Sequence, residues 1–295
     1  MSARIEKLVG QATLQALPLV GFRRFGVPTG GAFDVESLLL ANRLLANGMD
    51  APAIELANAS AEIAFSSSTR IAVVGAPVEL DLGAANAAFD VQAGETLRVP
   101  APRDGLCVYV AVAGGWIPDG IESRLARHGR PIVAGDVFEH REAPPAGAIQ
   151  RLAEPPTSFR QGLFRVVRGP QPILEVGGLR ALRVSNQSNR TGIRLDGLAP
   201  RELQEMVSEP ACPGAVQFTP SGQLIVIGPD GPTIGGYPKP AVVCSVDLDR
   251  LAHLRPGQEV AFEEIDLDTA RRLAAERDAR LAHTLAQVEI GVKRE

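Results

Sequence analysis

The chain carries many short apolar runs, some continuous and some alternating with polar residues, and Gly or Pro separates most of them. Such runs are typical of strands, and several lie roughly 8–12 residues apart, as in a barrel or a sandwich. The runs that we expect to form strands are residues 70–76, 77–83, 106–114, 163–169, 182–186, 215–219, 223–228, 241–248 and 259–265. The pattern therefore predicts a mainly β architecture.

A first helix is predicted over 35–47. Asp34 can cap its first turn, and Gly48 suits the position after its last turn. One apolar stripe follows the helical period: Leu38, Ala41, Leu44 and Leu45.

A second helix is predicted over 268–289, with a thinner stripe formed by Leu273, Leu281, Leu285 and Val288. Its charged remainder indicates a solvated face, and an intersubunit helix is the alternative. Asp266 and Asp268 stand at its start, where capping is the interpretation favoured over a carboxylate pair.

The domain organisation follows from a segment poor in apolar periodicity. Residues 141–162 are rich in Pro and Ala, which is typical of a linker. Residues 98–120 and 217–240 both run Pro, Gly, apolar strand, Gly-Gly and Pro, which favours two related barrel-like halves. The predicted parts are an N-terminal half (1–145), a linker (146–162), a C-terminal half (163–266) and a C-terminal helix (267–295).

Composition narrows the functional classes. The net charge of −4 and the pI near 5.7 give no basic footprint for nucleic acid. Cys107, Cys212 and Cys244 are scattered without CxxC spacing, which favours reduced thiols and a cytoplasmic protein. We see no signal peptide in the first 21 residues and no apolar run long enough to span a membrane.

Familiar catalytic signatures are missing. The sequence has no P-loop, dinucleotide fingerprint, HExxH or GxSxG. The four histidines lack metal-ligand spacing, so no metal site is predicted: His128, His140, His253 and His283. Cys107 alternates with apolar residues, which is typical of a packed core thiol.

Three stretches could carry chemistry. "GVPTGGAFD" (26–34) places two glycines before a capped helix, whose free N–H groups could bind a carboxylate; the alternative is a loop that needs positive φ. "SNQSNRTGIRLDG" (185–197) could clamp an anion through its arginines, or form a surface turn. "GPDGPTIGGYPKP" (228–240) combines a rigid, side-chain-poor loop with Tyr237 and with Lys239, one of only three lysines.

Together these stretches resemble a known family over roughly residues 9 to 263. The motifs that carry the resemblance are "GVPTGGAFD" (26–34), Ala41-Asn42-x-Leu44, "AIE" (53–55), "AVAGGW" (111–116), "SNRTG" (188–192), "RLDG" (194–197), "SEPACPGAVQ" (208–217), "GGYPK" (235–239) and "DLDRLAHLRPGQEV" (247–260). The chain resembles the KipA family, which includes allophanate hydrolase subunit 2 and the C subunit of 5-oxoprolinase and is described as biotin-dependent carboxyltransferase-like.

The resemblance implies a cyclophilin-like β-barrel and two kinds of partner chain, namely a KipI-like chain and a third, LamB/YcsF-like chain. It implies either ATP-dependent opening of 5-oxoproline to glutamate, with ATP bound by a partner, or carboxyl transfer from biotin to urea or an amide. A non-catalytic binding or regulatory protein is the third hypothesis. The sequence does not separate the first two, since it holds neither a biotinyl-lysine motif nor an ATP site.

The chain departs from the family pattern mainly in its first half. Where the family has T-x-Q-D-x-G-R-x-G, Ala16, Pro18 and Leu19 replace the Asp, Gly and Arg. The usual S-G-A-M-D appears as "GGAFD" with Gly30 in place of Ser, G-S-R-S-T appears as "ESRLA" (122–126), and Gln171 replaces the His of a G-P-H motif. The C-terminal motifs are better preserved.

The resemblance and the residue types together predict the site. Lys239, Tyr237 and Arg190 are the expected catalytic residues: Arg190 would hold a substrate carboxylate, and Lys239 would stabilise developing negative charge. Residues expected to bind the substrate are Asn189, Thr233, Gly235, Gly236, Gln217, Gly30, Gly31 and Asp34.

Overall fold

The computed structural model describes residues 1–118, 131–142, 151–152, 156, 163–204 and 206–293. The chain divides into two compact units. The first unit comprises residues 1–18, 34–159 and 281–295, and the second comprises 19–33 and 160–280. Residues 19–33 therefore group with the second unit, whereas the sequence placed them in the N-terminal half. The predicted linker over 146–162 lies almost wholly outside the described residues.

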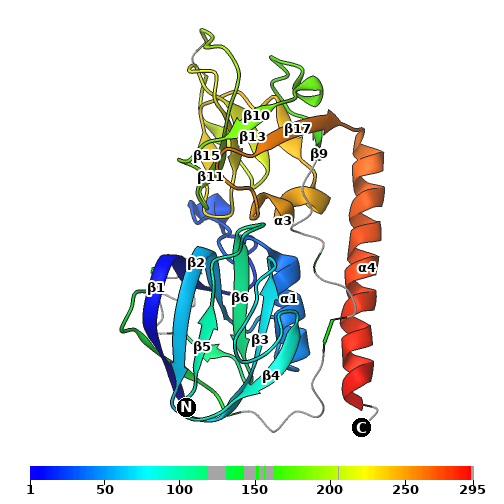
Figure 1. Cartoon of the computed structure of the whole chain (residues 1–295). Coiled ribbons are helices and arrows are strands. Elements are labelled where there is room, and N and C mark those ends of the chain that lie inside the picture. Colours follow the sequence, from blue (N-terminus) through cyan, green and yellow to red (C-terminus); the bar gives the residue numbers. More distant parts are fainter. Residues whose placement is uncertain (119–130, 143–150, 153–155, 157–162, 205, 294–295) are drawn as a thin grey trace. The chain divides into compact units, whose positions relative to one another are not determined.

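The first unit is built on an eight-stranded sheet in the order β4-β3-β6-β2-β1-β8-β7, with β5 also paired to β2 (Figure 1). The strands are β1 (Ser2–Gln15), β2 (Ala53–Phe65), β3 (Thr69–Gly75), β4 (Ala87–Val91), β5 (Thr96–Val99), β6 (Cys107–Val112), β7 (Trp116–Ile117) and β8 (Val137–His140). Neighbouring strands of this sheet run antiparallel. The strands share a buried core around Trp116 and Phe65.

The two longest strands, β1 and β2, were not predicted. The pairing register of β1 with β2 shifts between Ile5 and Lys7 and again between Val9 and Gln11, so apolar alternation along β1 is broken. Gly10 stands at the second shift with φ of 102°, and a Cβ there would lie 2.4 Å from the Asn58 carbonyl oxygen. Only glycine fits this bulge.

The strand predicted over 77–83 is wrong. The alternating side chains of Val78, Leu80 and Leu82 do pack against the core, which explains the strand-like pattern. The backbone forms no strand there, and Pro77 has no N–H to donate to a ladder.

Helix α1 (Val35–Leu44) packs against β3 and β6 and begins at Asp34 as predicted. Its apolar stripe is buried, but its end differs from the prediction. Ala46, with φ of 54°, takes the left-handed position expected of Gly48. The side chain of Asn47 donates to Asn42 Oδ1 and to the Val112 carbonyl, which holds this turn without a glycine.

The second unit is a closed barrel in the order β10-β11-β14-β13-β16-β9-β17. Its strands are β9 (Leu163–Arg168), β10 (Leu182–Val184), β11 (Gly192–Asp196), β13 (Ala215–Phe218), β14 (Leu224–Ile227), β16 (Ala241–Val243) and β17 (Glu259–Glu264). The parallel pair β9–β17 closes the ring, and a two-stranded ribbon of β12 (Glu209–Pro210) and β15 (Ile234–Gly235) lies outside it. The mainly β fold with a barrel is thus confirmed; the closed barrel is the second unit, whereas the sheet of the first unit follows an open order in the described residues.

Most strand predictions in this unit hold, but the one over 241–248 ends early. After β16 the chain turns through a 3-10 helix (Ser245–Asp247) into α3 (Leu248–Leu251). The cause is Asp247, whose buried carboxylate accepts hydrogen bonds from the backbone and guanidinium of Arg165 and from Arg250. A continued strand would move this carboxylate away from Arg165.

Helix α4 (Leu267–Lys293) confirms the second helix prediction. Asp266 caps it by accepting from the Thr269 N–H at 2.7 Å and the Thr269 hydroxyl at 2.9 Å. The predicted stripe is half-buried to buried, and most of the remaining surface is exposed.

Candidate functional site

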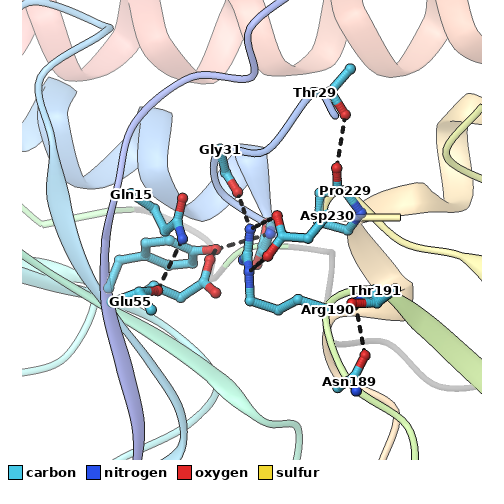
Figure 2. Close-up of polar contacts among 12 residues, drawn as sticks. Gln15, Thr29, Gly31, Glu55, Asn189, Arg190, Thr191, Pro229 and Asp230 are labelled. Atoms are coloured by element: carbon cyan, nitrogen blue, oxygen red, sulfur yellow. Dashed lines mark hydrogen bonds and ion pairs between the residues drawn. The ribbon is translucent and has the colours of Figure 1, made fainter. Parts of the chain in front are cut away.

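The loop 228–240 of the second unit is fixed at its start by residues from near the N-terminus. The Pro229 carbonyl accepts hydrogen bonds from the Gly30 N–H at 3.0 Å and the Thr29 hydroxyl at 3.1 Å. Figure 2 shows the Thr29 contact and the neighbouring Asp230. Gly228 allows a close approach, because a Cβ there would lie 2.1 Å from the Arg190 carbonyl oxygen. The loop inferred from its glycines and prolines is therefore anchored by the stretch 26–34, which the sequence singled out as a candidate site but not as a partner of this loop.

Arg190 forms a forked ion pair inside the protein. Its Nε and Nη2 contact the two carboxylate oxygens of Asp230 at 2.8 and 2.9 Å, and Nη2 also donates to the Gly31 carbonyl at 2.6 Å (Figure 2). Both side chains are mostly buried, and the guanidinium lies over the Phe33 ring. A carboxylate already occupies the bidentate geometry expected for a substrate carboxylate. The structure thus gives Arg190 an internal partner, and its substrate role stays a prediction.

Gly30 and Gly31 have positive φ angles of 54° and 77°, as the loop interpretation requires. Gly30 uses its N–H on Pro229, and Gly31 offers its carbonyl to Arg190. The arrangement does not support the expectation that Gly30 donates to a substrate, because its N–H is already engaged. These two residues hold the loop 228–240 and Arg190 in place.

Lys239 is a buried cation with few hydrogen-bond partners. It is 3% exposed, yet its ammonium has only two contacts among the described residues: Glu209 Oε2 at 3.4 Å and the Gly235 carbonyl at 3.5 Å. An ammonium carries three donors, and both contacts are long for hydrogen bonds. Burying a charge is costly unless it is paired and hydrogen-bonded. Lys239 therefore retains bonding capacity for a further acceptor.

Gln217 adds a second underused donor beside the same glycine. It lies on β13, is 4% exposed, and its Nε2 is buried without a hydrogen-bond partner in the described structure. A Cβ on Gly235 would lie 2.2 Å from this nitrogen, so the amide packs directly under the Gly235 backbone. Buried polar groups are nearly always hydrogen-bonded, so the Gln217 amide retains a donor that a ligand could use.

Glu209 and Gln171 complete this group, and sequence reasoning did not assign them a role. Gln171 Nε2 donates to Glu209 Oε2 at 2.8 Å, while Gln171 Oε1 accepts from the Lys239 N–H at 3.0 Å. Glu209 also pairs with Gly235 across the β12–β15 ribbon. We call Gln171, Glu209, Gln217, Gly235 and Lys239 the Lys239 cluster. The only sequence feature that could have drawn attention to them is that each stands beside a proline, Gln171 in "GPQP" and Glu209 in "SEP".

The remaining predicted site residues of the stretches 185–197 and 228–240 lie nearer the protein surface than Lys239 and Gln217. Tyr237 is 43% exposed, and Gly236 is exposed as well. The Thr233 carbonyl accepts from the Ala211 N–H, which ties the ribbon together. Asn189 is exposed, and its side chain accepts from the Thr191 N–H at 2.8 Å, which stabilises a turn. Tyr237 and Gly236 are thus presented at the surface, whereas Asn189 has a local structural partner.

Asp34 belongs to the first unit and is fully buried. Its carboxylate accepts from the Ser37 N–H at 3.0 Å and the Ser37 hydroxyl at 2.5 Å, and its N–H donates to the Tyr109 hydroxyl at 2.9 Å. Tyr109 in turn donates to Glu55 Oε2 at 2.5 Å, and burial together with the nearby Glu55 carboxylate raises the Tyr109 pKa well above its usual value. Asp34 therefore acts as a helix cap within this buried network. The sequence feature that could have revealed the network is Glu55, a charged residue flanked by apolar residues in β2.

Metal-ligand clusters and membrane-spanning helices are not found in the part of the chain that the structure describes. Its residues contain no group of three or more His, Cys, Asp and Glu side chains that could hold a metal ion. None of the helices in that part of the chain combines the length and apolarity needed to cross a membrane.

The comparisons with known proteins agree with these motifs. The family model "Carboxyltransferase domain, subdomain A and B" matches residues 25–264. The chain belongs to this carboxyltransferase domain family. The chain is 31% identical over 278 residues to the C subunit of 5-oxoprolinase from Escherichia coli (strain K12), covering 85% of this chain and 87% of that protein. The resemblance to the family of this 5-oxoprolinase component is thereby confirmed.

Urea amidolyases contain a similar region. The protein from Lachancea kluyveri is 28% identical over 316 residues, covering 90% of this chain but 17% of the urea amidolyase. The solved structure of the K. lactis urea amidolyase has a TM-score of 0.80 at 25% identity and covers 96% of this chain and 20% of that protein. The chain therefore spans most of the 5-oxoprolinase relative, whereas it spans less than a quarter of a urea amidolyase.

Proposed function

We propose that this chain is a component of a 5-oxoprolinase-type enzyme complex, which opens a cyclic amide with ATP consumed in a partner chain. Its similarity to the C subunit of 5-oxoprolinase extends over nearly the full length of that protein. Because the relative is a subunit, it has partner chains of its own. For this chain we propose a KipI-like partner and a LamB/YcsF-like third component.

One observation supports a catalytic site rather than a scaffold. Lys239 and Gln217 are each less than 5% exposed, both lie against Gly235, and both have unused hydrogen-bond donors among the described residues. Two unused donors beside the same glycine suit an oxygen on which negative charge develops, as when water adds to an amide carbonyl. The charge of Lys239 would stabilise that oxygen more in the transition state than in the ground state. We therefore assign Lys239 and Gln217 to the amide oxygen.

The sequence contains no recognisable site for the ATP that this reaction consumes. The sequence contains no phosphate-binding loop, and we assign ATP to no residue of this chain. ATP would enter through a partner chain, and this chain's own task would be to hold and polarise the amide.

A second candidate function is carboxyl transfer from biotin to urea or an amide. The 0.80 TM-score to the K. lactis urea amidolyase over 96% of this chain favours it. Biotin would come on another chain, since this one has no biotinyl-lysine motif. The two functions differ in their biotin requirement, and a non-catalytic binding protein remains the outcome if neither activity is found.

The test begins with affinity purification of the tagged protein from its native host and mass spectrometry of the chains that co-purify. The purified complex is then assayed for ATP-dependent conversion of 5-oxoproline to glutamate, with and without avidin to remove biotinylated protein. Avidin-insensitive cleavage supports the proposal, and avidin-sensitive carboxylation of urea supports the second function. A stoichiometric complex with neither activity, or no partner at all, would favour the binding protein.

A further inference from the structure

The Lys239 cluster is balanced in charge. It contains one ammonium and one carboxylate, on Lys239 and Glu209, separated by 3.4 Å, and the amides of Gln171 and Gln217 are neutral. A site that binds a free carboxylate usually presents a cation without a counter-charge, or a fork of donors. An anion that entered here would approach Glu209 as well as Lys239, and like charges repel. The balance of charge disfavours an anionic group and suits a neutral, dipolar one.

The carboxylate of Glu209 is held by hydrogen bonds to one of its two oxygens. Its Oε2 accepts from Gln171 and Lys239, whereas its Oε1 has no hydrogen-bond partner among the residues that the structure describes. Its side chain is 43% exposed, so the carboxylate can be reached by a donor from outside. Gln171 is itself fixed at both ends of its amide and through its backbone N–H, which donates to the Lys239 carbonyl.

The cluster thus offers two donors and one acceptor around one glycine. The donors are Lys239 Nζ, which contacts the Gly235 carbonyl, and Gln217 Nε2, which packs against the Gly235 backbone. The acceptor is Glu209 Oε1, and Glu209 pairs with Gly235 across the β12–β15 ribbon. A carbonyl oxygen beside an N–H presents the complementary pattern. A carboxylate presents two acceptors and no donor.

We propose that Glu209 is a substrate-binding residue that accepts the N–H of a neutral amide, while Gln171 is the positioning residue that holds it, so that the cluster selects an amide edge over a free carboxylate. This inference deepens the proposed function and rests on it for the location of the site. It adds Glu209 and Gln171 to the site and assigns the selectivity to their charge and hydrogen bonding.

The sequence provides a direct probe, because Lys239 is one of three lysines. Protein labelled with carbon-13 only at lysine gives a small set of side-chain signals, which Lys7→Arg and Lys293→Arg assign. The isolated full chain is titrated with 2-pyrrolidinone, a neutral lactam, and separately with sodium acetate at matched ionic strength. We expect the Lys239 signal to shift with the lactam and not with acetate, while the signals of Lys7 and Lys293 stay fixed.

Variants then test each role. Glu209→Gln removes the negative charge, and we expect it to weaken lactam binding about tenfold and to let acetate shift the Lys239 signal, since a hydrogen bond to a charged group is lost and the ammonium is unmatched. Gln171→Leu should weaken lactam binding less and leave acetate excluded. Glu202→Gln, an exposed acid on the same unit, is the matched control and should bind like the unaltered protein.

Two results would overturn the inference: a Lys239 shift with acetate in the unaltered protein, or no shift with the lactam at concentrations where Glu202→Gln and the unaltered protein are folded. Selectivity unchanged in Glu209→Gln would remove Glu209 from the site. The titration needs no partner, ATP or turnover. A lactam-selective shift in a protein whose complex fails to cleave 5-oxoproline would therefore contradict only the proposed function.

Discussion

Gly235 and Gly236 are neighbours in the loop, yet alanine should have different effects at the two positions. A Cβ on Gly235 would lie 2.2 Å from Gln217 Nε2, whereas a Cβ on Gly236 meets nothing closer than 3.5 Å. Since carbon and nitrogen atoms in contact sit about 3.5 Å apart, Gly235→Ala must push the Gln217 amide away by more than about 1 Å. Neither glycine has a positive φ, so backbone strain does not complicate the comparison.

The displacement should have two measurable effects. Overpacking costs about 1–3 kcal/mol of unfolding free energy, and the lower end of this range applies because the displaced atom is the end of the Gln217 side chain, which can rotate aside. A misplacement of about 1 Å in a site can lower turnover roughly 10²-fold. We therefore expect Gly235→Ala to lower the urea midpoint and the kcat of the purified complex, and Gly236→Ala to change neither by much. Unfolding is followed by circular dichroism in urea, and turnover by glutamate formation.

A double variant separates packing from chemistry. Gln217→Ala combined with Gly235→Ala removes the clash, so the free energy of unfolding should recover toward that of Gln217→Ala alone, while turnover stays low because the donor is lost. The reasoning is refuted if Gly235→Ala and Gly236→Ala behave alike, or if the double variant remains less stable than either single one.

Three further predictions concern other residues. Lys239→Met should lower kcat by roughly 10²-fold with a smaller change in KM, because its charge acts on the transition state; near-normal kcat in the intact complex would exclude this role. Burial alone would raise the Asp247 pKa, but hydrogen bonds from Arg165 and the charge of Arg250 lower it overall. Its contribution to stability is therefore present above the unfolded pKa of about 3.9 and is lost as the pH falls through the folded pKa. Asp247→Asn should cost about 3 kcal/mol at pH 7 and less below pH 4, measured by urea unfolding at several pH values, and an equal cost at every pH would contradict the assignment. Asp34→Ala should lower the unfolding free energy by at least about 1 kcal/mol, since the cap and the partner of the Ser37 hydroxyl are both lost, while Asp34→Asn should retain most of it; thermal unfolding distinguishes them.

The sequence predicted the parts of the fold that obey local rules. Asp34 and Asp266 begin helices because short polar side chains cap free N–H groups, a pattern visible within four residues. Continuous apolar runs such as Cys107–Val112 form strands buried on both faces. The β1 strand was not predicted because its bulge at Gly10 breaks the alternation of apolar and polar residues. Residues 77–83 were wrongly predicted as a strand because their apolar side chains pack against the core although their backbone does not pair with a neighbouring strand.

The site was less predictable, because it depends on contacts distant in sequence. The loop 228–240 and Lys239 stand out through composition alone, but the pairing of Arg190 with Asp230 spans 40 residues and leaves no local trace. Gln171 and Glu209 meet Lys239 only through the barrel and its ribbon. Sequence reasoning assigned Arg190 to the substrate because an arginine between small polar residues does not reveal which carboxylate it meets.

The second unit is discontinuous along the chain, which has a consequence for its biosynthesis. Residues 19–33 leave the ribosome early, but the strands that they support follow only after residue 160, and the barrel closes only when β17 pairs with β9. At about 5–20 residues per second, the early segment stays without its final partners for many seconds. A fragment that begins at residue 160 would leave the Pro229 carbonyl without its Thr29 and Gly30 donors. Expression of this unit alone should therefore include residues 19–33 on a linker or as a co-expressed peptide.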